Sequence, residues 1–245
     1  MSIYIEKAKE EFYKIANKHH LLNTKIVIKS RVLTPEEAIG NPDRRDFPLL
    51  KGRERIMEAE FKNSKGHVFT DMPGNYADTL KNILKKKIKN NFHRAVLIAS
   101  INAVMRHLNL IKDTKHCKDN DPEKCAKKVS RYLKENFKGK KRLALVGYQP
   151  AFIEELSKSF TLNVLDLSEE NLGEKYGVPV LDGEKFLKDV IDWAEIVLAT
   201  GTVFVNDTIE KIAKLKPIED IVFYGVTVSG IAELLNLKRV CFYSK

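Results

Sequence analysis

The second half of the chain alternates short apolar segments with segments of helical periodicity, and this alternation restricts the fold more than any other feature. The apolar segments RLALVGY, LNVLDL, EIVLAT, DIVFYG and RVCFYS occupy residues 142–148, 162–167, 195–200, 220–225 and 239–244. Helical segments occupy residues 122–137, 151–159, 183–193, a stretch from about 207, and 229–235. Short apolar strands that alternate with helices are typical of a parallel sheet covered on both faces. We therefore predict a Rossmann-like domain with four or five strands.

The first half has a different pattern, which favours an α+β unit. Residues 3–18 predict a helix, and the segments 24–33 and 66–71 predict strands. The segment 76–88 predicts an amphipathic helix. The next segment, 92–111, is apolar nearly all round, which indicates a helix buried at the centre of a domain or between two domains.

The chain has 245 residues, which suits two small domains with cores of their own. The pattern changes near residues 112–121. We therefore predict an α/β protein with an α+β domain over residues 1–115 and a Rossmann-like parallel-sheet domain over residues 116–245.

Several classes of protein do not fit the sequence. The apolar runs are far shorter than the roughly 18 residues of a membrane span, and the start MSIYIEKAKEEF lacks the apolar run of a signal peptide. Three cysteines do not make a disulfide framework. We expect a soluble cytoplasmic protein with free thiols and no membrane partner. A single glutamine beside plentiful Lys, Glu and Ile resembles proteins that work at high temperature.

The formal net charge of +10 raises the question of nucleic-acid binding. Runs such as KNILKKKIKNN and KENFKGKKR place lysines at helical spacing beside apolar residues, with few aromatic side chains for base stacking. This pattern favours solvated helix faces, so we do not expect specific nucleic-acid binding. Homo-oligomer formation stays open.

Candidate binding residues follow the strands of the second half, because ligands of open α/β sheets bind beyond the carboxyl ends of the strands. Gly147 in GYQP permits a tight turn, although the segment lacks the GxGxxG fingerprint and also fits an ordinary turn. Asp166 stands where such domains often hold a ribose, or caps a helix. The full set after the strands is Gly147, Tyr148, Gln149, Asp166, Thr200, Gly201, Thr202, Asn206, Thr208, Gly225, Thr227 and Ser229.

The segment TGTVFVNDT (200–208) is the most informative of these strand ends. Its hydroxyl and amide groups offer neutral donors and acceptors, and backbone N–H groups before a helix at 207 could hold an anion. Alternatively, Asn206 or Asp207 is a plain N-cap of that helix. In GVTVSGIAELL, either Thr227 or Ser229 is expected to be the cap of the following helix, with the other facing a cleft.

The first half adds a charged, turn-rich stretch, GNPDRRDFPLLKGRE, and a long ordered loop of this kind is often functional. It brings Asp43, Asp46, Lys51, Arg53 and Glu54 together, and Asp71 could meet the same region. Asn102, within the apolar helix, is either a satisfied core amide or a group that faces an interdomain cleft.

HCKDNDPEKC (116–125) raises the question of a metal site. Its spacing does not match the two-to-four-residue spacers of zinc sites, and Asp121 and Pro122 fit the start of a helix that turns Cys125 into the core. His116 and Cys117 remain as candidate soft ligands for a divalent or heavy metal ion, although two ligands alone do not complete a site.

A family resemblance rests on motifs spread over nearly the whole chain. They are TPEEAIGNPDRRDFPLLKG, GHVFTDMPG, the Asn-Ala of SINAVM, HCKDNDPEKCAKKV, VGYQPAFIEEL, TGTVFVNDT and GVTVSG. In combination these resemble the putative heavy-metal chelation family, whose members pair an enolase N-terminal-like domain with a Rossmann-like domain. The resemblance implies an interdomain cleft formed by Asn41, Asp46, Asp71, Gly147, Gln149, Thr202, Asn206 and Thr227. Val226 stands where the family has proline.

Two functions follow from these observations. The first is a protein whose interdomain cleft binds a small polar or anionic molecule, alone or with a metal, in heavy-metal chelation or the metabolism of a metal cofactor or chelator. The alternative is an enzyme, a transferase or lyase, that uses a nucleotide-like cosubstrate such as S-adenosylmethionine, with Asp166 on the ribose. No nucleophile motif such as GxSxG is present, so no catalytic residue is assigned.

Overall fold

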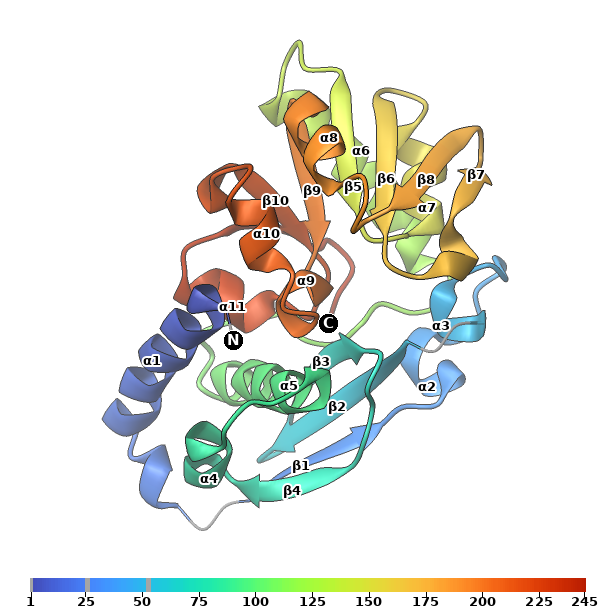
Figure 1. Cartoon of the computed structure of the whole chain (residues 1–245). Helices are drawn as coiled ribbons and strands as arrows, with labels where there is room; N and C mark the ends of the chain where they lie inside the picture. The colour runs from blue at the N-terminus through green and yellow to red at the C-terminus, as the bar shows by residue number, and fades with distance from the viewer. Residues whose placement is uncertain (1, 25–26, 52–53) are drawn as a thin grey trace.

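A computed structural model describes residues 2–24, 27–51 and 54–245 of the chain, and it contains two sheets (Figure 1). The first sheet is antiparallel, in the order β3-β2-β1-β4. Its strands are β1 (Val27–Val32), β2 (Arg55–Phe61), β3 (Ser64–Thr70) and β4 (Tyr76–Thr79). The helices of this half are α1 (Ile3–Lys18), η1 (Leu21–Asn23), α2 (Pro35–Ile39), α3 (Pro48–Lys51), α4 (Leu80–Lys85) and α5 (Asn91–His107).

The second sheet has seven strands in the order β11-β10-β9-β5-β6-β8-β7, and every pair is parallel except β7 with β8. Its strands are β5 (Arg142–Val146), β6 (Thr161–Asp166), β7 (Gly173–Lys175), β8 (Val178–Asp182), β9 (Ile196–Thr200), β10 (Ile221–Tyr224) and β11 (Lys238–Val240). Without the edge strand β7, the chain order across the sheet is 3-2-1-4-5-6, the order of doubly wound dinucleotide-binding sheets. The predicted class, an α+β unit followed by a largely parallel sheet, is confirmed.

Helices connect the strands of the second sheet. They are α6 (Asp121–Asn136), α7 (Pro150–Leu156), η2 (Glu169–Asn171), α8 (Leu187–Trp193), α9 (Thr202–Val205), α10 (Ile209–Ala213), η3 (Ile218–Asp220) and α11 (Ser229–Leu234). Among the described residues, no helix combines the length and apolarity that a membrane crossing requires.

Several predicted elements need correction. Strand β2 was not predicted, because the charged residue Glu58 interrupts its apolar pattern. The Glu58 side chain is nevertheless buried, beside His67. The first four residues of the predicted helix 76–88 form strand β4, because they pair with β1. The helix begins at Leu80, and Thr79 is its N-cap. The antiparallel hairpin of β7 and β8 raises the strand number above the predicted four or five. Residues 25 and 26 of the predicted strand 24–33 lie outside the described residues.

Helix α5 separates the two sheets and packs against both halves of the molecule (Figure 1). Its residues 95–105 are buried, as expected for the apolar segment 92–111, although the helix ends at His107. One face packs on β2 and β3, and the other meets α9 and α11. A single hydrophobic cluster therefore runs from the first sheet through α5 to β9 and β10. Because this core is shared, the division of the chain at residue 115 stays a prediction.

Candidate functional site

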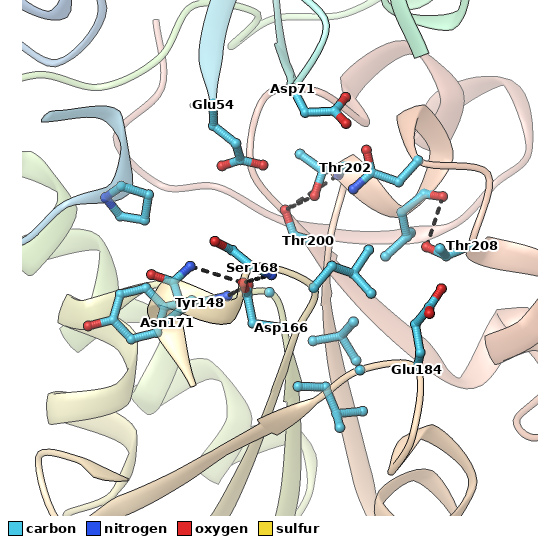
Figure 2. Close-up of a pocket in the computed structure, with 18 of the residues that line it drawn as sticks. Glu54, Asp71, Tyr148, Asp166, Ser168, Asn171, Glu184, Thr200, Thr202 and Thr208 are labelled. Atoms are coloured by element: carbon cyan, nitrogen blue, oxygen red, sulfur yellow. Dashed lines mark hydrogen bonds between the residues drawn. The ribbon is translucent and has the colours of Figure 1, made fainter. Parts of the chain in front are cut away.

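A cleft of about 1180 Å³ lies between the two sheets, beyond the carboxyl ends of β5, β6 and β9 (Figure 2). Glu54 and Asp71 project into it from the ends of β2 and β3. Opposite them lie Asp166 and the hydroxyls of Thr200 and Thr202. Of the predicted site residues, those that line the cleft are Asp46, Asp71, Gly147, Tyr148, Asp166, Thr200, Thr202, Asn206 and Thr208.

A second, smaller cavity of about 110 Å³ adjoins the cleft, and we call it the annex. Five further residues of the predicted site line the annex and not the cleft, namely His116, Cys117, Gln149, Gly225 and Thr227. All three cysteines of the chain line it. The cleft and the annex share Pro48, Glu54, Tyr148, Thr200, Thr202 and Tyr224, so these residues form the opening between the two spaces.

Four predicted binding residues have structural roles instead and line neither of the two cavities found in the described part of the chain. The Asn102 amide lies within 3.2 Å of the carbonyls of His67, Val226 and Thr227, and its oxygen accepts from Gly230 N–H at 2.8 Å. Ser229 Oγ donates to the carbonyl of Val226, and the backbone N–H of Asn41 donates to Asp119. A Cβ on Gly201 would lie 2.7 Å from the nitrogen of Val228, which explains that glycine by packing.

The predicted helix caps also need correction. Asn206 ends the short helix α9, and α10 begins only after Thr208, so neither Asn206 nor Asp207 caps a helix at 207. Neither Thr227 nor Ser229 caps α11, because its N-cap is Val228 and Ser229 is its first residue. Thr227 Oγ1 instead accepts from the backbone N–H of Phe69 at 3.0 Å, which joins the two halves of the molecule. The N-cap of α6 is Asn120 rather than Asp121.

The cleft is acidic although the chain is basic. The carboxylates that line it are Asp46, Glu54, Asp71, Asp166, Glu169, Glu170, Glu174, Glu184 and Asp207. Among the lining residues that the structure describes, the cations are Lys51, Lys175 and Lys211; Arg53 lies outside the described residues. Because a cleft with an excess of one sign of charge concentrates ions of the opposite sign, this lining favours a positively charged ligand.

Glu54 lies in the site although the sequence did not predict it as a binding residue. In the sequence it is only one of several charged residues in a turn-rich stretch. It is half-buried at the opening between the cleft and the annex. Burial raises its pKa to about 7, and the nearby carboxylates of Asp166 and Asp71 act in the same direction. Glu54 therefore exchanges a proton near neutral pH.

Asp166 lies at the predicted place after the second strand of the parallel sheet, but its carboxylate already has protein partners. It accepts from the backbone N–H groups of Tyr148 at 2.7 Å and Ser168 at 2.9 Å, and from the Asn171 amide at 2.9 Å. These bonds fix the turn after β5 against β6. They occupy most of the acceptor positions that a ribose would use.

The turn after β5 is closed to phosphate in a similar way. Gly147 adopts a φ of +97°, as its predicted role in a tight turn requires. Gln149 Oε1 accepts from Phe152 N–H at 2.7 Å, and Pro150 has no N–H. The helix start that holds the pyrophosphate in dinucleotide-binding domains is thus capped by the chain itself.

Asp46 belongs to a set of contacts in the wall of the cleft. The Tyr176 hydroxyl donates to Asp46, and Arg44 donates to the same hydroxyl at 2.9 Å and pairs with Glu154 of α7. Burial and the hydrogen bond to Asp46 raise the pKa of Tyr176 to about 12. This set ties the loop after α2 to the hairpin of β7 and β8.

His116 and Cys117, the predicted metal ligands, lie in the annex with neutral side chains. His116 Nδ1 is 3.0 Å from the carbonyl of Ala38 and therefore carries a hydrogen. Burial lowers the pKa of His116 to about 4 and raises the pKa of the Cys117 thiol far above its ordinary value. No group of three His, Cys, Asp or Glu side chains within the described ranges is placed to hold a metal ion.

The low pKa of His116 predicts acid sensitivity. Its folded pKa of about 4 lies below an unfolded value of about 6.5, so only the unfolded chain takes up this proton between these limits. Stability is full above pH 6.5 and is expected to fall towards pH 4, by at most about 1.4 kcal/mol per pH unit from this group. Urea unfolding at a series of pH values measures the slope. His116→Asn should reduce it, whereas Asn136→Ala, an exposed change away from both cavities, should not.

Comparisons with known proteins agree with this architecture. Residues 132–240 match a family model, DUF364, described as "Putative heavy-metal chelation". A crystal structure from Pyrococcus horikoshii, of a DUF364 protein with unknown function, is similar with a TM-score of 0.56 at 15% identity, covering 92% of this chain and 80% of that one. A second such structure, from Desulfitobacterium hafniense, has a TM-score of 0.50 at 15% identity, covering 74% and 72%. A search of curated proteins gave no match.

Proposed function

We propose that this chain binds a small positively charged molecule or a positively charged metal chelate in its cleft. The match of residues 132–240 to the "Putative heavy-metal chelation" family, which the sequence resemblance predicted, supports a role with metal chelates. The observation that carries the proposal is the lining of the cleft, where nine acidic side chains, Glu54 with its raised pKa among them, face three lysines among the described residues. This distribution reverses the net charge of +10 that the whole chain carries.

If the ligand contains a metal, the metal enters as a chelate rather than as a bare ion, because the carboxylates line a wide space without converging. The cleft volume of about 1180 Å³ exceeds the roughly 300–1,000 Å³ of most small-molecule sites. In the part of the chain that the structure describes, no three potential ligands meet around one point. A metal ion that arrives with its own chelator needs only charge and hydrogen bonds from the protein, and the cleft offers both. The predicted polar or anionic ligand has less support than a cationic one.

The proposal is tested with hexaamminecobalt(III), a 3+ complex that does not exchange its ligands, against the anionic cobalt(III)–EDTA complex. Isothermal titration should show saturable binding of the cation and none of the anion. Asp71→Asn combined with Glu184→Gln removes two cleft charges and should weaken binding about fivefold or more. Glu219→Gln, a charge change outside the cleft lining, should change affinity by less than about twofold. Binding of the anion in preference to the cation would overturn the proposal.

The alternative, an enzyme with a nucleotide-like cosubstrate, has one observation in its favour, the 3-2-1-4-5-6 strand order with Asp166 after the second strand. The partners of Asp166 and the capped start of α7 reduce this support. S-adenosylmethionine has a net positive charge and therefore also suits an acidic cleft. Titration with S-adenosylhomocysteine, which lacks the sulfonium charge, and with NAD separates the alternatives, since a true nucleotide site should bind at least one of them at micromolar concentration.

A further inference from the structure

The annex differs from the cleft in the chemistry of its walls. Phe47, Phe69 and Phe152 line it together with the three cysteines, whose buried members carry neutral thiols. Buried thiols behave as small apolar groups. The annex is therefore a mainly apolar chamber that opens from an acidic cleft.

Within the described ranges, one acidic side chain lies at the opening between the two spaces. Glu54 is the only carboxylate among the described residues that line the annex, and it also lines the cleft. Thr200 and Thr202 lie at the same opening, with Thr202 Oγ1 donating to Thr200 Oγ1 at 3.2 Å. Figure 2 shows the Glu54 carboxylate pointing into the space above these hydroxyls. When one part of a ligand fills the annex, the next atoms of that ligand lie at the opening, beside this carboxylate.

We infer that the annex is a subsite for a short alkyl arm of an amine ligand, whose ammonium group pairs with Glu54 at the opening. The inference rests on the proposed function, because the ligand reaches the annex from the cleft. The volume of about 110 Å³ sets the length of the arm. An apolar cavity of about 150 Å³ holds the six carbons of benzene, so the annex holds about four. An n-butyl arm fits this space.

Binding of this ligand has a proton signature. With a pKa of about 7, Glu54 is about half protonated at neutral pH. An ammonium group beside it favours the ionised carboxylate, so binding lowers the pKa and releases a proton. At pH 7 the release is expected to be about half a proton per chain.

The first test measures this release with n-butylammonium chloride in a pH-stat at pH 7. The wild-type chain should release about half a proton at saturation, and Glu54→Gln should release none. Glu219→Gln, outside both cavities, should behave as the wild type. Equal release from the wild type and Glu54→Gln would refute the role of Glu54.

The second test measures the size of the subsite with ligand-observed NMR. Affinity should rise about fourfold per methylene from ethyl- to n-butylammonium and stop rising at n-hexylammonium. Cys241→Leu, which fills part of the annex, should weaken n-butylammonium about tenfold and leave hexaamminecobalt(III) binding unchanged. A flat series, or unchanged n-butylammonium affinity in Cys241→Leu, would overturn the inference.

One further measurement covers a Cys241→Leu variant that does not fold, and one outcome separates the inference from the proposed function. If Cys241→Leu does not fold, the labelling of wild-type Cys241 by methyl methanethiosulfonate replaces it, and n-butylammonium should slow this labelling. Labelling that n-butylammonium leaves unchanged would contradict an occupied annex. If hexaamminecobalt(III) binds and the alkyl series is flat, the inference about the annex fails while the proposed function stands.

Discussion

Replacing Gly66 by alanine is expected to lower the free energy of unfolding by about 3 kcal/mol or more, because the new methyl group has no room. A Cβ at this position would lie 2.4 Å from the carbonyl oxygen of Ala99 and 2.5 Å from the backbone nitrogen of Ala103. Both are backbone atoms of α5, so no side-chain rotation relieves the overlap. Strand β3 and α5 would have to separate, and their contact holds the helix that divides the two sheets.

Gly139→Ala is the matched control for this experiment. Gly139 has a φ of +80°, and no atom lies within 4 Å of an added Cβ there. Alanine should therefore cost only the roughly 1 kcal/mol of a left-handed backbone. Urea unfolding of the two variants beside the wild type gives the comparison. Equal losses would mean that α5 moves away from β3 easily, and that close packing at Gly66 does not fix the helix.

The parallel sheet could be predicted from the sequence, because its strands repeat a pattern that their burial on both faces requires. Strands β5, β6, β9, β10 and β11 all carry that pattern, and each was predicted. Strand β2 was missed because its pattern depends on a distant partner. Glu58 is buried only because His67 donates to it from β3 and Lys65 pairs with it, which holds the pKa of Glu58 at about 2. No local sequence pattern predicts a buried ion pair of this kind.

The candidate site was predictable where it follows strand ends, and less so where it depends on packing between the halves. Thr200, Thr202 and Asp166 stand at the carboxyl ends of strands and line the cleft as predicted. Glu54 shares no sequence signal with them, since its position at the opening depends on how the first sheet faces the second. The acidity of the cleft was hidden for the same reason. Its carboxylates come from segments far apart in a chain with a net charge of +10.

Asn102→Asp should have the second large effect on stability, about 4 kcal/mol, although it hardly changes the size of the side chain. The substitution removes both N–H donors and leaves a carboxylate facing three carbonyl oxygens, those of His67, Val226 and Thr227. Ser100→Ala on the same buried helix is the control, since its hydroxyl donates within the helix, to the carbonyl of Val96 at 2.6 Å. That change should cost about 1 kcal/mol.

The pH dependence of the Asn102→Asp variant separates loss of hydrogen bonds from general damage to the fold. A carboxyl group so placed is more stable protonated, because it then donates to one carbonyl and still accepts from Gly230 N–H. Its folded pKa therefore lies above the unfolded value of about 3.9. The deficit relative to wild type should be smallest below about pH 4 and grow as pH rises towards the folded pKa. A deficit that is the same at every pH would show that Asn102 acts through its shape alone. The loop that carries Thr227 to the annex would then depend on packing rather than on this amide.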